Sequence, residues 1–138
     1  MKNIIKIGHA KFWTDRNDIL YCQINSDNPK YKLDSNIVKL YINAIVKLCG
    51  GKAMPFLIDA RDSRGTFSPA AASLFSNATE LSELKISEAF IINSIGSKLL
   101  IRSYKRIYDP ITPHSIFNDM VTALEYCIET KNKFYGSN

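Results

Sequence analysis

The chain has 138 residues, of which 46% are apolar and 22% charged, and its formal net charge is +5. This length and composition are ordinary for one soluble globular domain and exclude two domains. The apolar runs, such as Ala89 to Ile92, are far shorter than the roughly 20 residues needed to span a bilayer. The start of the sequence has no apolar stretch of signal-peptide length, so we expect a cytoplasmic protein without a membrane span.

Neither the three cysteines nor the charge balance calls for a cofactor or a nucleic-acid partner. Cys22, Cys49 and Cys127 are odd in number, lie far apart and include no Cys-x-x-Cys pair, so we expect reduced thiols in apolar positions. No spacing typical of a metal site occurs, and we predict no metal or other cofactor. The net charge permits an anionic partner without requiring one, because many soluble domains have such a balance.

The first third of the chain predicts two strands and a helix. Lys6 to Trp13 and Ile19 to Asn25 have strand composition, and the short polar connection between them favours an antiparallel hairpin. Asp34 or Ser35 can cap a helix whose apolar residues recur at helical spacing. Gly50 and Gly51 end this helix, because glycine tolerates the left-handed cap conformation.

The central segment predicts a strand, a polar turn and a helix. The apolar strand Pro55 to Ile58 ends at Asp59, and the turn 61–65 follows. A helix then begins at Ser68, with Pro69 at its first position, where a missing N–H group costs nothing. In α/β proteins the carboxyl end of a strand and the amino end of the next helix meet where ligands bind, so this segment is the candidate site.

The last third alternates strands and helices. We expect a strand over 86–93, a helix from Ser94 to about Tyr108, a short strand over 114–117 and a final helix capped at Asn118. The tail from Lys131 to Asn138 is expected to fray. The order predicts a single α/β domain over 1–138. Its mixed sheet of four to five strands has an antiparallel N-terminal hairpin, then parallel crossovers, and packs with about four helices.

Several segments together carry a resemblance that covers the chain from about Ala10 to Ile128. They are Ala10-Lys11-Phe12-Trp13 before Asp18-Ile19-Leu20-Tyr21; Gly51-Lys52 before Pro55-Phe56-Leu57-Ile58-Asp59-Ala60-Arg61; and Pro110, Pro113 and Phe117 before Ala123-Leu124-Glu125. With these residues the chain resembles an uncharacterised bacterial STAS-like or Sec14-like family, related in fold to the sporulation anti-anti-sigma factors. The resemblance implies a STAS-like fold and implies little about activity, because fold does not fix function.

The densest polar cluster lies after the central strand, and two interpretations of it stay open. Its members are Asp59, Arg61, Asp62, Ser63 and Arg64, with Ser68 close behind. One interpretation is a docking or small-ligand site, because arginine and helix N–H groups can bind a phosphate or carboxylate. The other is a solvated turn whose carboxylates pair with the arginines. In phosphorylatable STAS proteins the regulated serine starts the helix after the central strand. The resemblance therefore points to Ser63 or Ser68, although the Asp-Ser-Arg-Gly turn departs from the family's Asp-Ser-Ser-Gly-like pattern.

A second polar set lies on the helix that begins near Ser94. Lys98, Arg102, Lys105 and Arg106 occupy one stripe of this helix at about 100° per residue. The stripe is either a basic docking face for an acidic partner, a lipid head group or nucleic acid, or the solvated side of a helix packed on the core. No nucleic-acid-binding motif accompanies it.

The sequence offers no catalytic constellation, because His9 and His114 lie far apart and none of the common hydrolase, metalloprotease or nucleotide-binding motifs occurs. Our leading hypothesis is a non-enzymatic regulatory or binding module that docks an unknown protein partner or small ligand near the turn after the central strand. The alternatives are a carrier of an apolar small molecule or lipid, and an unrecognised enzyme. An open sheet edge or a helix face would also permit a homo-oligomer.

Overall fold

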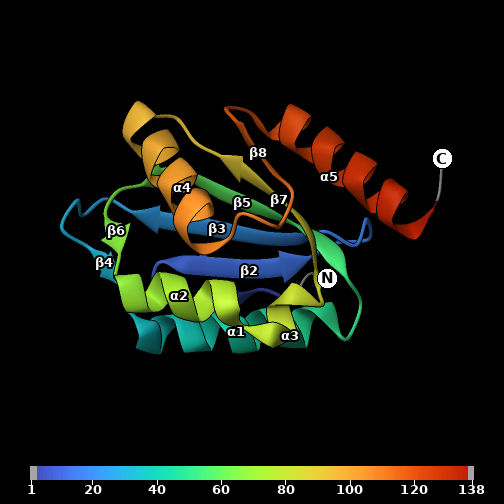
Figure 1. Ribbon diagram of the computed structural model, residues 1–138, viewed down its shortest axis with the longest axis horizontal. Helices are drawn as coiled ribbons and strands as arrows, with labels where there is room; N and C mark the ends of the chain where they lie inside the picture. The colour runs from blue at the N-terminus through green and yellow to red at the C-terminus, as the bar shows by residue number, and fades with distance from the viewer. Residues whose placement is uncertain (1–2, 137–138) are drawn as a thin grey trace.

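A computed structural model describes residues 3–136 of the chain. Within this range, the side chain of Asp62 is not described. The strands are β1 (Ile5–Ile7), β2 (Ala10–Thr14), β3 (Leu20–Ser26), β4 (Lys32–Leu33), β5 (Met54–Ser63), β6 (Thr66–Phe67), β7 (Lys85–Ile91) and β8 (His114–Phe117). The helices are α1 (Ser35–Cys49), α2 (Pro69–Asn77), α3 (Thr79–Ser82), α4 (Ile95–Tyr108) and α5 (Met120–Tyr135). Figure 1 shows their arrangement.

Six of these strands form one mixed sheet in the order β1-β2-β3-β5-β7-β8. β2 is antiparallel to both of its neighbours, β1 and β3, whereas β3, β5, β7 and β8 are parallel neighbours. The predicted hairpin followed by parallel crossovers is therefore confirmed. Parallel neighbours need crossover connections, and the helices supply them. The central position of β5 agrees with its apolar run, because a central parallel strand is buried on both faces.

The predicted element counts and several boundaries were wrong. The sheet has six strands instead of four to five, because the expected first strand divides at Gly8, whose φ of 56° turns the chain between β1 and β2. A further two-stranded sheet, β4 with β6, lies beside it. The helices number five within the described residues instead of about four, since the single-turn α3 follows α2.

The C-terminal helix also differs from the expectation. The side chain of Asp119, rather than Asn118, caps it by accepting a hydrogen bond from the N–H of Thr122. The helix continues to Tyr135 instead of fraying from Lys131, and Gly136 ends it with a φ of 76°. The Tyr135 hydroxyl donates to the carbonyl oxygen of Ala53, which holds this end against the start of β5. Residues 137 and 138 of the predicted tail lie outside the described residues.

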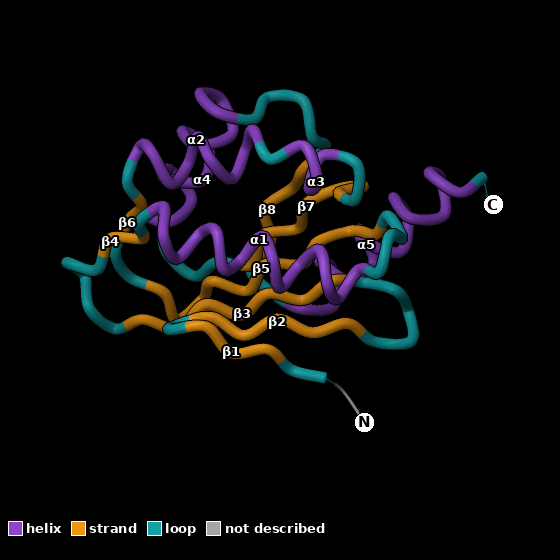
Figure 2. Tube along the Cα trace, turned by 90° about the horizontal axis from the view of Figure 1, so that it is seen from below, coloured by secondary structure: helices purple, strands orange, loops and turns teal. Residues whose placement is uncertain are grey.

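The helices cover the two faces of the sheet unequally. Figure 2 shows α1, α2, α3 and α4 on one side of the sheet, and the larger core cluster lies there, with Phe12, Leu20 and Phe56 almost fully buried. A smaller cluster on the other face packs Leu57 and the neighbouring strands against α5. Alternate residues of β5 thus enter different cores, as the period of two in a strand requires.

Candidate ligand cavity

The polar cluster predicted after the central strand is divided between the two faces of the sheet. β5 does not stop at Asp59 but runs to Ser63, so the predicted turn over 61–65 shrinks to Arg64 and Gly65. Strands β3 and β5 are paired through Gln23 and Asp59, and the register shifts before Asn25 and Asp62. Such a bulge bends the strand and changes which side chains share a face.

Asp59 and Arg61 are two residues apart in β5 and pair with each other. The Arg61 Nη2 atom lies 2.7 Å from Asp59 Oδ2, and Arg61 Nε lies 3.0 Å from Asp59 Oδ1. The hydrogen bond from the Arg61 side chain holds the pKa of the buried Asp59 carboxyl below its usual value. This two-point pairing is the geometry that arginine and carboxylate groups prefer, and it occupies the predicted anion-binding arginine.

The other described members of the predicted cluster, Ser63, Arg64 and Ser68, do not take part in the Asp59–Arg61 pair. Ser63 is half-buried and Arg64 is exposed, and both line the cavity described below. The Oγ atom of Ser68 accepts a hydrogen bond from the N–H of Ala71 at 3.0 Å, so the predicted cap of α2 is confirmed. A phosphorylated Ser63 or Ser68 stays a prediction. Asp62 belongs to β5, and its side chain lies outside the described residues.

An apolar cavity of about 220 Å³ lies between the sheet and the helices on its larger-core face. The sheet side of the cavity is formed by β2, β3, β5 and β7, and the helix side by α1, α2 and α4. One end is formed by β4, β6 and the turn between β5 and β6. Aromatic and aliphatic side chains dominate the lining, among them Phe12, Tyr41, Phe56, Phe75 and Phe90. Such a site favours the apolar part of a ligand, because burial of apolar surface is the main favourable term.

The turn at the end of this cavity is fixed by backbone contacts. Gly65 has a φ of 108°, and a Cβ atom built on it would lie 2.4 Å from the carbonyl oxygen of Tyr31. The N–H groups of Thr66 and Ser68 donate to the carbonyl oxygens of Tyr31 and Leu33, at 2.9 Å each. The segment after the central strand and the segment before α1 thus form the cavity end together.

The only thiol among the described lining residues is not a reactive one. Burial, with a smaller contribution from Asp59, raises the pKa of Cys22 to about 12. Burial likewise raises the pKa of Cys49 to about 11 and that of Cys127 to about 12. Because the thiolate is the nucleophilic form, these thiols are unreactive near neutral pH. All three cysteines are free, as predicted.

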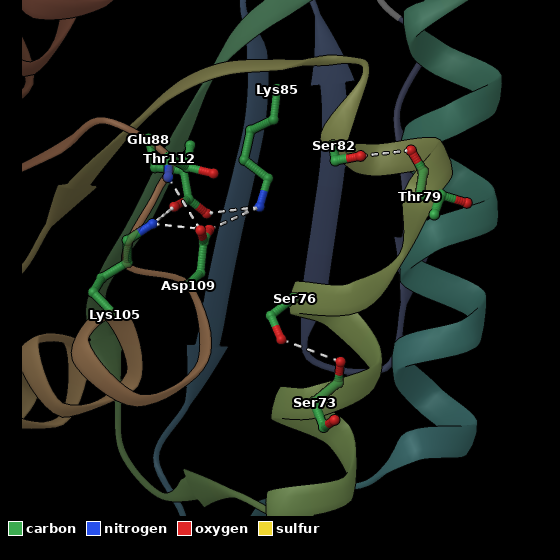
Figure 3. A network of polar contacts seen from close by, with 9 residues as sticks. All are labelled: Ser73, Ser76, Thr79, Ser82, Lys85, Glu88, Lys105, Asp109 and Thr112. Atoms are coloured by element: carbon green, nitrogen blue, oxygen red, sulfur yellow. Dashed lines mark hydrogen bonds and ion pairs between the residues drawn. The ribbon is translucent and has the colours of Figure 1, made fainter.

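A buried network of four charged side chains lies beside the cavity (Figure 3). Lys105 Nζ lies 2.5 Å from Glu88 Oε1 and 3.0 Å from Asp109 Oδ2, while Lys85 Nζ lies 3.3 Å from Glu88 Oε2. Each of these side chains is at most 10% exposed. Burial alone would raise the pKa of Asp109, but hydrogen bonds from Lys105 and Thr112 lower it to about 2. Two cations and two anions share the network, so its formal charge is zero.

This network corrects the predicted basic face of α4. Lys105 does not belong to that face, because it points into the network and is 3% exposed. Arg102 and Arg106 are exposed and Lys98 is half-buried, beside the exposed apolar side chains Ile95 and Leu99. A docking role for this reduced face stays a prediction, as does a homo-oligomer.

The sequence analysis also missed Lys85, Glu88 and Asp109. The spacing of Lys105 was a usable signal, since it lies four residues after Ile101 and four before Asp109 on the inward side of the helix. Within the described residues, no cluster of His, Cys, Asp and Glu side chains could hold a metal ion. No described helix is long and apolar enough to cross a bilayer.

Residues 12–131 match the model of a protein family described as a domain of unknown function, DUF7793. The chain belongs to the DUF7793 family. No curated protein matches it. Among solved structures it is similar to the crystal structure of an uncharacterised DUF3478-family protein with a SpoIIAA-like fold from Shewanella loihica PV-4. The sequence identity is 14%, the alignment covers 92% of each chain, and the TM-score is 0.56.

This likeness establishes the fold alone. The SpoIIAA-like fold is the STAS fold, so the STAS-like architecture predicted for this DUF7793 domain is confirmed. Neither match carries an activity, and folds of this kind host many functions. The function therefore has to be argued from the cavity.

Proposed function

We propose that this domain is a non-enzymatic binding module that holds a small apolar ligand in the cavity between the sheet and α1, α2 and α4. The observation that carries the proposal is the cavity itself, with about 220 Å³ lined by mainly aromatic and aliphatic side chains. An engineered apolar cavity of about 150 Å³ takes up benzene, so this one has room for roughly two fused rings.

The position of the cavity is compatible with two functions that the sequence left open: docking near the turn after the central strand, and carriage of an apolar ligand. Ser63, Arg64 and Gly65 of the turn after the central strand are lining residues. Arg64 is exposed while Phe12 and Phe56 are buried, so the lining extends from the surface into the core. A ligand could then be bound next to the turn proposed for docking, and its apolar body would lie beneath that turn.

The chemistry of the lining supports binding rather than turnover. Glu88 is a lining residue, but both of its carboxylate oxygens are paired with lysines. Cys22 is held as a thiol by its raised pKa. No histidine is among the described lining residues. A hydrolytic reaction would need a nucleophile, a base and an orienting group that converge on one place.

The test is binding of indane, an uncharged two-ring hydrocarbon, to the purified domain, measured by NMR titration. We expect saturable shifts of amide signals from residues that line the cavity. Ala60 lines the cavity from β5, so Ala60→Leu should fill part of it and weaken indane binding by about tenfold or more.

The matched control is Ala70→Leu, because Ala70 is exposed on α2 and is not a lining residue. This variant should bind indane as the natural sequence does. Native mass spectrometry of the freshly purified protein would show a retained ligand directly. Absence of saturable binding by indane, with both variants folded, would contradict the proposed function.

A further inference from the structure

The charged residues that line the cavity lie at its two ends. Among the described lining residues they are Arg64 and Glu88. Phe56, Ile58 and Ala60 line the cavity from alternate positions of β5. Glu88 is paired with Phe56 in the sheet, whereas Arg64 follows the end of the strand. Since a strand rises by about 3.3 Å per residue, the lining is elongated and extends over roughly 20–25 Å between these ends.

The positive charge at the exposed end is available to a ligand. Arg64 is exposed, and its guanidinium forms no ion pair with any of the described residues, whereas that of Arg61 is bound to Asp59. The backbone holds Arg64 in place, because its N–H group donates to the carbonyl oxygen of Ser26 at 2.7 Å. Guanidinium groups bind carboxylates at two points, and these charge-assisted hydrogen bonds are stronger than neutral ones.

The inner end offers no place for a polar group of the ligand. Both carboxylate oxygens of Glu88 are paired, one with Lys85 and the other with Lys105. The hydroxyl oxygen of Tyr104 has no hydrogen-bond partner among the described residues, but it is buried and does not face the cavity space. A charged ligand group at this end would lose its hydration without gaining a partner. The apolar part of a ligand therefore belongs here, and its polar part belongs at the exposed end.

We infer that the ligand of this cavity is an amphipathic monocarboxylate, whose apolar chain lies along β5 and whose carboxylate binds Arg64 at the exposed end. The inference rests on the proposed function and specifies the chemical class of its ligand. A flexible chain can follow the elongated lining, and its burial supplies the main favourable term. The carboxylate stays in contact with water at the exposed end, so little of its hydration is lost.

The sign of the ligand's charge follows from Arg64. The segment before α1, which forms the same end, carries Lys30, Lys32, Asp27 and Asp34, and none of them is a lining residue. Their formal charges sum to zero, and Asp34 is engaged as the cap of α1 through the N–H group of Ile37. Arg64 therefore favours an anion there and repels a cation.

Three probes with one chain test the inference: octanoate, 1-octanol and octylammonium. Their dissociation constants are measured by NMR titration for the natural sequence, Arg64→Gln, Arg64→Lys and Arg16→Gln. Arg16→Gln is the matched control, because Arg16 is exposed between β2 and β3, is not a lining residue, and its loss changes the net charge equally. Amide NMR spectra of each variant establish that it is folded.

We expect Arg64→Gln to weaken octanoate binding by about three- to tenfold, because the carboxylate loses a charged donor at an exposed site. Binding of 1-octanol should stay within about twofold, and octylammonium should bind more tightly than it does to the natural sequence. Arg64→Lys should keep part of the octanoate affinity, since it keeps the charge without the two-point geometry. Arg16→Gln should change no probe by more than about twofold. Added salt should reduce the difference between natural sequence and Arg64→Gln.

A further variant shows that the chain lies in the cavity. Because Ala60 is a lining residue, Ala60→Leu should weaken octanoate and 1-octanol alike, by about tenfold or more. Nuclear Overhauser effects should connect the terminal methyl group of octanoate to the Phe56 ring, and the methylene group next to its carboxylate to Thr66. These contacts would establish the direction in which the ligand lies.

The possible failures can be told apart. If 1-octanol binds and Arg64→Gln weakens octanoate no more than Arg16→Gln does, Arg64 does not bind the carboxylate, and the inference fails while the proposed function stands. If Ala60→Leu leaves octanoate binding unchanged, or if octylammonium binds most tightly, the inference also fails. If neither indane nor any of the three chain probes binds, both the inference and the proposed function are wrong.

Discussion

At the scale of single residues, the buried charges beside the cavity are tightly interdependent. Glu88 and Asp109 are both paired with Lys105, and Lys85 contacts the same two carboxylates while lying 4.8 Å from the centre of the Phe75 ring. A charge in such a place is tolerated only because it is paired and hydrogen-bonded. Removing one partner destabilises the protein by more than the intact pair stabilises it, because the remaining charge then stays buried without compensation.

Lys105→Met should therefore lower the free energy of unfolding by about 3–5 kcal/mol, since it strands Glu88 and Asp109 with one lysine between them. The matched control is Arg102→Met on the same helix, where the side chain is exposed and the expected change is within about 0.5 kcal/mol. Urea unfolding followed by circular dichroism measures both. Equal effects of the two changes would show that Lys105 is a surface charge, as the sequence analysis supposed.

These residues show what the sequence could and could not predict. The helical spacing of Lys105 indicated an inward position, but the stripe of four basic residues outweighed it. Its partner Glu88 lies in β7, in a stretch whose sequence predicts a buried apolar strand. No local sequence pattern therefore predicts the ion pair between Lys105 and Glu88. The unpartnered hydroxyl of Tyr104 could not be predicted at all, because it depends on every atom packed around it.

At the scale of elements, the turn between β5 and β6 determines the shape of the cavity end. The sequence predicted a polar turn and a capped helix here, and Ser68 does cap α2. It did not predict that β5 runs to Ser63 or that β6 pairs with β4. Those features arise because Gly65 and Thr66 contact Tyr31, which lies 34 and 35 residues earlier in the chain, and pairings between distant segments leave little trace in local composition.

Gly65→Ala should unfold this turn or strain it severely. The backbone there has a φ of 108°, and the new Cβ atom would collide with the carbonyl oxygen of Tyr31, which is backbone and cannot swing away. We expect a loss of at least about 2 kcal/mol in the free energy of unfolding.

Gly96→Ala is the matched control for this glycine. Gly96 lies in the first turn of α4, has no positive φ and has open space around its Cβ position. Because alanine favours a helix over glycine, this variant should be as stable as the natural sequence or more stable by up to about 1 kcal/mol. Thermal unfolding of both variants checks the pair. A Gly65→Ala protein as stable as Gly96→Ala would mean that the turn does not approach Tyr31 as closely as described.

At the scale of the whole molecule, one sheet supports two unequal layers, and the ligand cavity lies in the thicker one. Residues of α1, α2 and α3 belong to the larger core, α4 lines the cavity on the same face, and the smaller core is closed by α5. The STAS-like fold, with an antiparallel hairpin followed by parallel crossovers, was predictable, because hydrophobic periodicity and turn residues define the elements and topology rules limit their connections. The order of the strands in the sheet was not predicted. The cavity was not predictable from the sequence, because it is the space that the helices and the β4–β6 pair leave unfilled above the sheet.

The acid stability of the molecule should depend on Asp109, which ties the end of α4 to the network. Its pKa in the folded protein is about 2, below the ordinary value of 3.8. A group with a lowered folded pKa stabilises the fold fully above its unfolded pKa and loses that contribution as the pH falls through the folded pKa. The contribution of Asp109 is therefore complete above about pH 4 and is lost towards pH 2; it amounts to roughly 2 kcal/mol, at about 1.4 kcal/mol per pKa unit.

Urea unfolding at several pH values between 6 and 2 measures this dependence. The natural sequence should lose stability steeply below pH 4, with Asp59 adding to the slope because its pKa is also lowered. Asp109→Asn should start from a lower stability at pH 6, since Lys105 loses one anion, and should decline less between pH 4 and pH 2. Asp27→Asn, at an exposed position outside the network, should follow the natural sequence throughout. If Asp109→Asn has the full acid sensitivity of the natural sequence, the network does not hold Asp109 ionised.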